Sequence, residues 1–68
     1  MKNEKIGKLI KVLRIEHKLT QKQLANKLEI SDKAVSKWER GIGTPELSLI
    51  SDLSNLLEVN IANLLSAM

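Results

Sequence analysis

The spacing of apolar residues is the feature that most restricts how this chain can fold. Along almost its whole length, Leu, Ile and Val recur every three or four positions, which places their side chains on one face of an α-helix. No segment alternates between apolar and polar residues with the period of two that a half-buried strand requires, and no hairpin signal is present. Because 68 residues leave room for one small domain, the sequence predicts a single all-α domain over residues 1–68, a compact bundle of five helices.

Capping residues divide the chain into these helices. Thr20 and Gln23 form a capping box, and Ser31 is a good N-cap. Thr44 is predicted to cap a further helix that has Pro45 at its first position. The predicted elements are a helix from about Glu4 to His17, a helix from Gln21 to Leu28, a tight turn at Glu29 and Ile30, a helix after Ser31 that stops at Gly41, a helix from Pro45 and a last helix after Asn60.

Each predicted helix carries an apolar stripe that we expect to face a common core. Trp38, the one aromatic residue, follows Val35 by three positions and is expected to pack inward. The other stripes comprise Ile6, Leu9, Ile10 and Leu13; Leu24, Ala25 and Leu28; and Leu49, Ile50, Leu53, Leu56 and Leu57. The short last helix carries Ile61, Leu64 and Leu65.

The composition excludes several classes of protein. With no Cys and one His, the chain can form neither a disulfide framework nor a zinc site, and no other cofactor is implied. A domain of this size has little room to enclose a pocket, so we expect neither an enzyme nor a small-molecule substrate. No apolar run approaches the roughly 18 residues of a membrane span. The N-terminus also lacks the apolar stretch of a signal peptide, so a cytoplasmic protein is expected.

Charge is distributed unevenly along the chain. All 11 Lys and Arg residues lie within residues 1–40 together with five acids, which gives this part a net charge of +6. Residues 41–68 hold three acids and no base, a net charge of −3. This asymmetry favours a polyanionic partner for the first part of the chain. The alternative is that the lysines only solvate helix faces.

Two short helices joined by a tight turn, after a longer first helix, form the layout of a helix-turn-helix, whose second helix enters the DNA major groove. The segment LTQKQLANKLEISDKAVSKWERG, Leu19 to Gly41, resembles the helix-turn-helix of the phage repressor and Cro family, also called the xenobiotic response element family. The resemblance extends over nearly the whole chain and includes Ile6-Gly7, Leu13-Arg14, Pro45 and Val59–Leu65. It implies a lambda-repressor-like domain that binds double-stranded DNA sequence-specifically, commonly as a homodimer on a palindromic operator.

The chain departs from the family's pattern in three places. Glu29 and Glu58 stand where the family often has Gly, and at a position of positive φ Glu costs about 1 kcal/mol relative to Gly. The loop 42–44 carries no base, whereas relatives often place Lys or Arg there to grip phosphates. We therefore expect that contact to be missing.

The resemblance assigns the reading of bases to the third helix. These positions fall on Asp32, Lys33, Ser36 and Lys37, and the residue types suit base edges. Lys can donate to guanine O6 and N7, Asp can accept from cytosine N4, and Ser can do either. The alternatives are that Asp32 only stabilises the helix dipole and that the two lysines only solvate an exposed face.

Flanking residues are candidates for phosphate contacts. Thr20 and Gln21 stand at the start of the second helix, where backbone N–H groups can hold a phosphate. Arg40, at the end of the third helix, is another candidate. Gln21 alternatively braces the third helix or only caps its own.

Arg14 and Glu39 are predicted to form a largely buried ion pair. Arg14 lies on the stripe of Ile10, and Glu39 follows Val35 by one turn, so both charges point inward. An unpaired buried charge costs several kcal/mol, so each needs the other. Members of the family often carry such a pair. His17, at the end of the first helix, is expected to have a structural role.

Together these patterns predict a DNA-binding transcriptional regulator, a repressor rather than an activator by resemblance. Leu64, Leu65 and Met68, in the base-free C-terminal part, are the candidates for an apolar patch that joins two copies; alternatively they complete the core of one copy. The alternative function is a helix-turn-helix domain used mainly for protein contact, such as an antitoxin or adaptor. The basic first forty residues argue against it.

Overall fold

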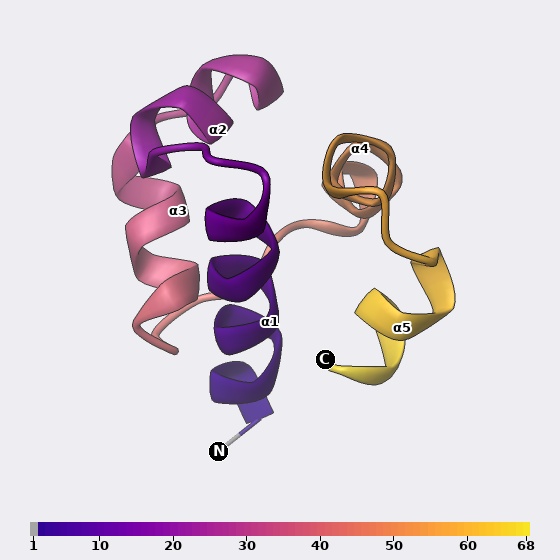
Figure 1. Ribbon diagram of the computed structural model, residues 1–68. Coiled ribbons are helices and arrows are strands. Elements are labelled where there is room, and N and C mark those ends of the chain that lie inside the picture. Colours follow the sequence, from indigo (N-terminus) through magenta and orange to yellow (C-terminus); the bar gives the residue numbers. More distant parts are fainter. Residues whose placement is uncertain (1) are drawn as a thin grey trace.

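Five α-helices follow one another in the computed structural model, which describes residues 2–68 and, from residue 4 onward, their side chains (Figure 1). No strand occurs within residues 2–68, so the predicted all-α five-helix fold is confirmed. The helices are α1 (Lys2–Glu16), α2 (Gln21–Leu28), α3 (Asp32–Glu39), α4 (Leu47–Leu57) and α5 (Ile61–Ser66).

The helices surround one apolar core. In Figure 1, α1 stands between the α2–α3 pair and the α4–α5 pair. Its inward residues Ile6 and Ile10 are fully buried, and α3 contributes Val35 and Trp38 to the same core, as predicted. The remaining buried apolar side chains are Leu24, Ala25, Leu28, Ile50, Leu53, Leu57, Leu64 and Ala67. The recognition of apolar stripes in the sequence therefore locates most of the core.

A close backbone approach joins α1 to α3 at Gly7. A Cβ atom added to Gly7 would lie 1.9 Å from the backbone carbonyl oxygen of Trp38, a distance that no side chain can occupy. Glycine is thus the residue that lets the two helix backbones meet. The same end of α3 is closed by Gly41, whose φ of +77° allows its N–H to donate to that Trp38 carbonyl at 3.1 Å.

The ends of α2 and α4 adopt the left-handed conformation that the family's glycines suggest. Glu29, after α2, has φ of 58°, and Glu58, after α4, has φ of 52°. The strain anticipated at these two positions is therefore present. At its other end α2 begins with the predicted capping box, in which the Gln23 N–H donates to the Thr20 hydroxyl and the Thr20 N–H donates to the Gln23 side chain.

The prediction for the start of α4 is wrong. Thr44 and Pro45 were expected to cap and begin this helix, but it begins at Leu47, and Glu46 occupies the N-cap position without a side-chain cap hydrogen bond. The φ angle of proline, about −65°, fits an extended segment as well as a first helical turn, so Pro45 does not distinguish them. Pro45 is buried and lies before the helix rather than inside it.

Helix α5 turns one of its two adjacent leucines inward. Leu64 is buried in the core, whereas the side chain of Leu65 is 47% exposed. Successive helical residues turn by about 100°, so the two side chains point in different directions. Within the described residues, no helix is both long and apolar enough to cross a membrane.

Candidate functional site

The candidate site begins with a tight connection between α2 and α3. The Ile30 N–H donates to the Ala25 carbonyl at 3.0 Å, and the Glu29 N–H donates to the Asn26 carbonyl at 3.2 Å. Ser31 then caps α3 by accepting a hydrogen bond from the Ala34 N–H. This helix, turn and helix reproduce the predicted helix-turn-helix.

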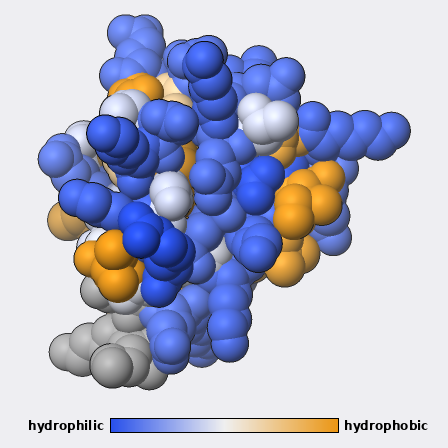
Figure 2. All heavy atoms as spheres, turned by 90° about the vertical axis from the view of Figure 1, so that its left-hand side faces the viewer, coloured by the Kyte–Doolittle hydropathy of each residue, from blue (hydrophilic) through white to orange (hydrophobic). Residues whose placement is uncertain are grey.

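The two sides of α3 differ sharply. Its inner side buries Val35 and Trp38, whereas Asp32, Lys33 and Lys37 are exposed. Ser36, between the two lysines, is partly buried. Figure 2 views the molecule from the side on which α2 and α3 lie and shows a largely hydrophilic surface. The structure therefore brings all four predicted base-reading residues onto α3 and leaves three of them fully available to solvent.

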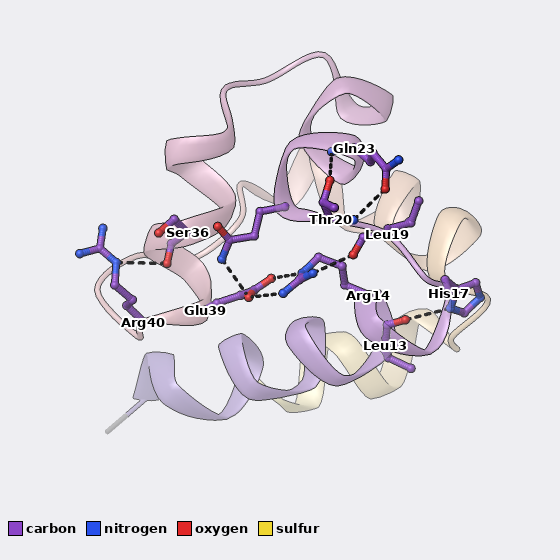
Figure 3. Close-up of polar contacts among 10 residues, drawn as sticks. Leu13, Arg14, His17, Leu19, Thr20, Gln23, Ser36, Glu39 and Arg40 are labelled. Atoms are coloured by element: carbon purple, nitrogen blue, oxygen red, sulfur yellow. Dashed lines mark hydrogen bonds and ion pairs between the residues drawn. The ribbon is translucent and has the colours of Figure 1, made fainter.

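A partly buried polar network connects α3 to α1 and to the start of α2 (Figure 3). Arg14 Nε donates to Glu39 Oε2 at 2.7 Å, and Arg14 Nη2 donates to Glu39 Oε1 at 3.0 Å, a bidentate pair. The third guanidinium nitrogen, Nη1, donates to the Leu19 carbonyl at 2.7 Å. With side chains only 12% and 4% exposed, Arg14 and Glu39 form the inward ion pair that their spacing indicated.

Gln21 joins the same network. Its Nε2 donates to Glu39 Oε1 at 3.1 Å, so the first residue of α2 is tied to the last residue of α3. Phosphate contact, bracing of α3 and capping of α2 were the roles considered for Gln21, and this contact corresponds to the bracing of α3. A carboxylate held by three donors cannot rotate freely, so α1, α2 and α3 are fixed relative to one another.

The other flanking residues remain at the surface. Arg40 is exposed, and its Nε donates to the Ser36 carbonyl at 3.4 Å, which draws the side chain back along α3 (Figure 3). Thr20 is exposed and uses its hydroxyl as the N-cap of α2. Among the described side chains, neither Lys33, Lys37 nor Arg40 forms an ion pair. Their positive charges are therefore directed to solvent.

The sequence analysis missed one polar contact between distant segments. His17 Nδ1 lies 2.9 Å from the Leu13 carbonyl oxygen, and His17 Nε2 lies 3.1 Å from Glu58 Oε2. Both partners are acceptors, so both ring nitrogens donate only when the imidazole is protonated. The hydrogen bond to Leu13, followed by that to Glu58, raises the pKa of His17 above its ordinary value of 6.5. A contact 41 residues apart has no local signal in the sequence.

The predicted dimer patch requires a correction. Leu64 is completely buried in the core of one copy and cannot contribute to a surface, because α5 turns this side chain toward the bundle. Leu65 is exposed and Met68 partly so. Ile61, one turn before Leu65, is 41% exposed and was not singled out for this surface. The apolar side chains that α5 leaves accessible are thus Ile61, Leu65 and Met68.

The site is a surface rather than a cavity. Within the described residues no pocket is found, and no three His, Cys, Asp or Glu side chains come together as metal ligands would. What the α2–α3 surface offers is a rigid, exposed helix with lysines one turn apart. Such a surface suits recognition of a large anionic partner.

Comparison with known proteins agrees with this geometry. The helix-turn-helix family HTH_3 matches residues 10–64. The HTH-type transcriptional activator BcrR of Enterococcus faecalis is 42% identical over 64 residues, which are 94% of this chain and 29% of that protein. The HTH-type transcriptional regulator DicA of Escherichia coli (strain K12) is 42% identical over 57 residues, 84% of this chain and 42% of that protein. The chain thus spans less than half the length of both relatives.

Solved structures show the same fold. Two crystal structures of the clp gene regulator ClgR from Corynebacterium glutamicum superpose with TM-scores of 0.84 and 0.81. Each covers 98% of this chain, at 22% sequence identity, and the match spans 71% and 87% of the respective ClgR chains. The five-helix arrangement is therefore shared with a protein of distant sequence.

Proposed function

Because this chain belongs to the helix-turn-helix family HTH_3, we propose that it binds double-stranded DNA sequence-specifically as part of a transcriptional regulator. Its relatives BcrR and DicA are transcriptional regulators, not enzymes. The observation that carries the proposal is the exposed, cationic side of α3, held in place by the network of Arg14, Gln21 and Glu39.

Base reading is assigned to the exposed side of α3. Lys33 and Lys37 lie one turn apart and match the acceptors of guanine in the major groove. Asp32 has no side-chain role in capping, because Ser31 performs it, so its carboxylate is available to accept from cytosine N4. Ser36 is partly buried between the two lysines, and we assign it a hydrogen bond to a base edge that lies close to α3.

Contacts to the DNA backbone are assigned to the two ends of the helix pair. Arg40 carries an unpaired positive charge at the end of α3, and Thr20 stands at the exposed N-terminus of α2, where N–H groups point outward. Gln21 contributes in two ways: its amide nitrogen braces Glu39, and the backbone at this position faces the phosphate. Such contacts set register and carry no sequence information.

A homodimer on a palindromic operator completes the proposal. The side chains Ile61, Leu65 and Met68 supply the self-complementary apolar patch, now without Leu64. A two-fold axis beside α5 would set two copies of α3 one DNA turn apart, roughly 34 Å. Residues 41–68 carry three acids, few enough for two copies to approach.

Repression is the mode of regulation that the family resemblance favours. In this mode the dimer occupies its operator and blocks transcription. The relative BcrR is an activator, so a reporter gene placed behind the selected operator provides the direct test. Lower reporter output on expression of the protein supports repression, and higher output contradicts it.

The decisive experiment for DNA binding is selection from randomised duplexes followed by salt titration. A single palindromic consensus is expected. A dimer that touches about six phosphates should lose on the order of a thousandfold in affinity between 50 and 200 mM salt. No binding even at low salt would overturn the proposal and leave the protein-contact function, as in an antitoxin or adaptor.

A further inference from the structure

A second exposed surface, on α1, belongs neither to the core nor to the proposed DNA contact. Residues at i, i+3, i+4 and i+7 share one face of a helix, and α1 carries two such sets. The inner set packs into the core and comprises Ile6, Leu9, Ile10 and Leu13. The outer set, which we call the α1 outer face, comprises Lys8, Lys11, Val12 and Ile15.

The apolar half of the α1 outer face is accessible to solvent. Val12 is 52% exposed and Ile15 is 54% exposed, and the two lie one turn apart. Both are β-branched, so each has one strongly preferred rotamer in a helix and loses little side-chain freedom on contact. A pair of rigid aliphatic side chains on a solvent-exposed helix is suited to packing against another apolar surface.

The other half of the α1 outer face is cationic. Lys8 lies one turn before Val12, and Lys11 one turn before Ile15. Among the described side chains, neither lysine forms an ion pair. An exposed acid flanks the α1 outer face at each end, Glu4 one turn before Lys8 and Glu16 one turn after Val12. The surface thus presents two unpaired positive charges directly beside two exposed aliphatic side chains.

This surface is directed away from the proposed DNA contact. Gly7 and Arg14, on the flank of α1, face α3: Gly7 meets the Trp38 backbone and Arg14 bonds to Glu39. Successive helical residues turn by about 100°, so the centre of the α1 outer face points roughly a quarter turn away from α3. The surface therefore stays accessible when α3 lies in a groove.

We propose that the α1 outer face docks an acidic amphipathic helix of another protein. Four positions at helical spacing match the ridge that a partner helix packs against. The lysines select acids on the partner, and Val12 and Ile15 select aliphatic side chains one turn further along. DNA offers no apolar counterpart at its backbone, and the larger apolar face of α1, which a lipid surface would need, is already in the core.

The test uses the full chain and a fluorescently labelled synthetic helix of about 20 residues, above the roughly 12–15 residues below which isolated helices are marginal in water. The peptide carries two Glu one turn apart followed by two Leu one turn apart on the same face. Fluorescence anisotropy measures its binding, with the same residues in scrambled order as the control peptide. We expect saturable binding of the ordered peptide and at least tenfold weaker binding of the scrambled one.

Two variants of the protein locate the contact. Lys8→Glu with Lys11→Glu removes two exposed charge pairs, and about a tenfold loss of peptide affinity is expected. Val12→Ala with Ile15→Ala keeps the charges and the helix and should also weaken binding about tenfold. The matched control, Lys33→Glu with Lys37→Glu on α3, should leave peptide binding within about twofold, because it makes the same change of charge at two exposed lysines of another helix. Circular dichroism verifies that each variant is folded.

Three outcomes would overturn the proposal. Equal binding of the scrambled peptide would show that binding depends on the net charge of the peptide and not on the order of its side chains. Equal loss in the α3 control variant would place the contact elsewhere. Binding of anionic lipid vesicles that depends on Lys8 and Lys11, without binding of the ordered peptide, would assign the surface to a membrane instead. The proposed DNA binding is scored separately on duplexes, so its failure leaves this result unaffected.

Discussion

Arg14 and Glu39 come from α1 and α3, 25 positions apart, and meet in a bidentate ion pair that is almost completely enclosed. Gln21 also donates to the Glu39 carboxylate, and Arg14 also donates to the Leu19 carbonyl. One carboxylate and one guanidinium thus connect three helices and a turn. In the low-dielectric interior, removing one member of such a pair is strongly destabilising, because the remaining charge is left without a partner.

Removing either member of this pair should strongly destabilise the domain. We expect Arg14→Ala or Glu39→Ala to lower the free energy of unfolding by about 3 kcal/mol, since each leaves a buried charge. The double variant should cost much less than the sum. Urea unfolding of all four proteins completes a double-mutant cycle, and simple additivity would show that the pair contributes no coupling.

The close approach at Gly7 predicts an effect of unusual sign. Gly→Ala inside a helix normally stabilises by about 1 kcal/mol. Here the new methyl group would lie 1.9 Å from the Trp38 carbonyl oxygen, so α1 and α3 must separate. We expect Gly7→Ala to destabilise by about 2 kcal/mol or more. Thermal unfolding measures it, and a raised Tm would contradict the helix contact described above.

The strained cap at Glu29 offers a stabilising substitution. Its φ of 58° is one that glycine adopts without cost, so Glu29→Gly should stabilise the domain by about 0.5–1 kcal/mol. Glu58→Gly relieves the same kind of strain but removes the contact with His17, and should gain less. Chemical denaturation of the two variants side by side tests this order. An equal gain would mean that the His17 contact contributes nothing.

His17 should make stability depend on pH. The Leu13 carbonyl and Glu58 raise its pKa in the folded state above 6.5, so the contribution is fully present below about pH 6.5 and is lost as the pH rises through the folded value. NMR titration of the imidazole gives the folded pKa directly. Glu58→Gln should lower that pKa, and His17→Gln should remove this component of the pH dependence. A pKa unchanged by Glu58→Gln would refute the contact.

DNA binding should separate Lys33 from Arg40. Lys33→Ala is expected to weaken binding to the selected operator by about 1–3 kcal/mol and to relax selection at one base position. Arg40→Ala should weaken binding to all sequences about equally and reduce the salt slope by about one unit. Parallel titrations of operator and random duplex distinguish these patterns. Equal effects of Lys33→Ala on both duplexes would remove Lys33 from the base-reading set.

The sequence predicts local features of this molecule better than distant ones. The capping box of Thr20 and Gln23 and the stripe of Ile6 and Ile10 were recognisable because their signals lie within a few residues. The start of α4 was not, because Pro45 fits an extended chain as readily as a helix. For α5, a helix of 6 residues, periodicity did not settle which leucine faces inward.

The candidate site follows the same division. The positions on α3 were assigned from the family resemblance, and the buried Val35 and Trp38 agree with the side of the helix that it leaves outward. The inward direction of Arg14 and Glu39 could also be predicted, because two opposite charges on apolar stripes avoid the cost of an unpaired buried charge by pairing with each other. The brace from Gln21 was one of the roles considered for this residue, and its hydrogen bond to Glu39 agrees with it. The contact of His17 with Glu58 was not predicted, because it depends on how loops place side chains in space, which spacing along the chain does not encode.

The split between the two sides of α3 bears on how such domains diversify. Val35 and Trp38 pack in the core and Glu39 forms the ion pair, whereas the side chains of Asp32, Lys33 and Lys37 are exposed and form no ion pair among the described residues. Substitutions at exposed positions away from structural contacts usually change stability by less than about 0.5 kcal/mol. Mutations on the outer side of α3 can therefore introduce new side chains with little effect on folding stability. During evolution the target of such a domain can change while its fold is retained.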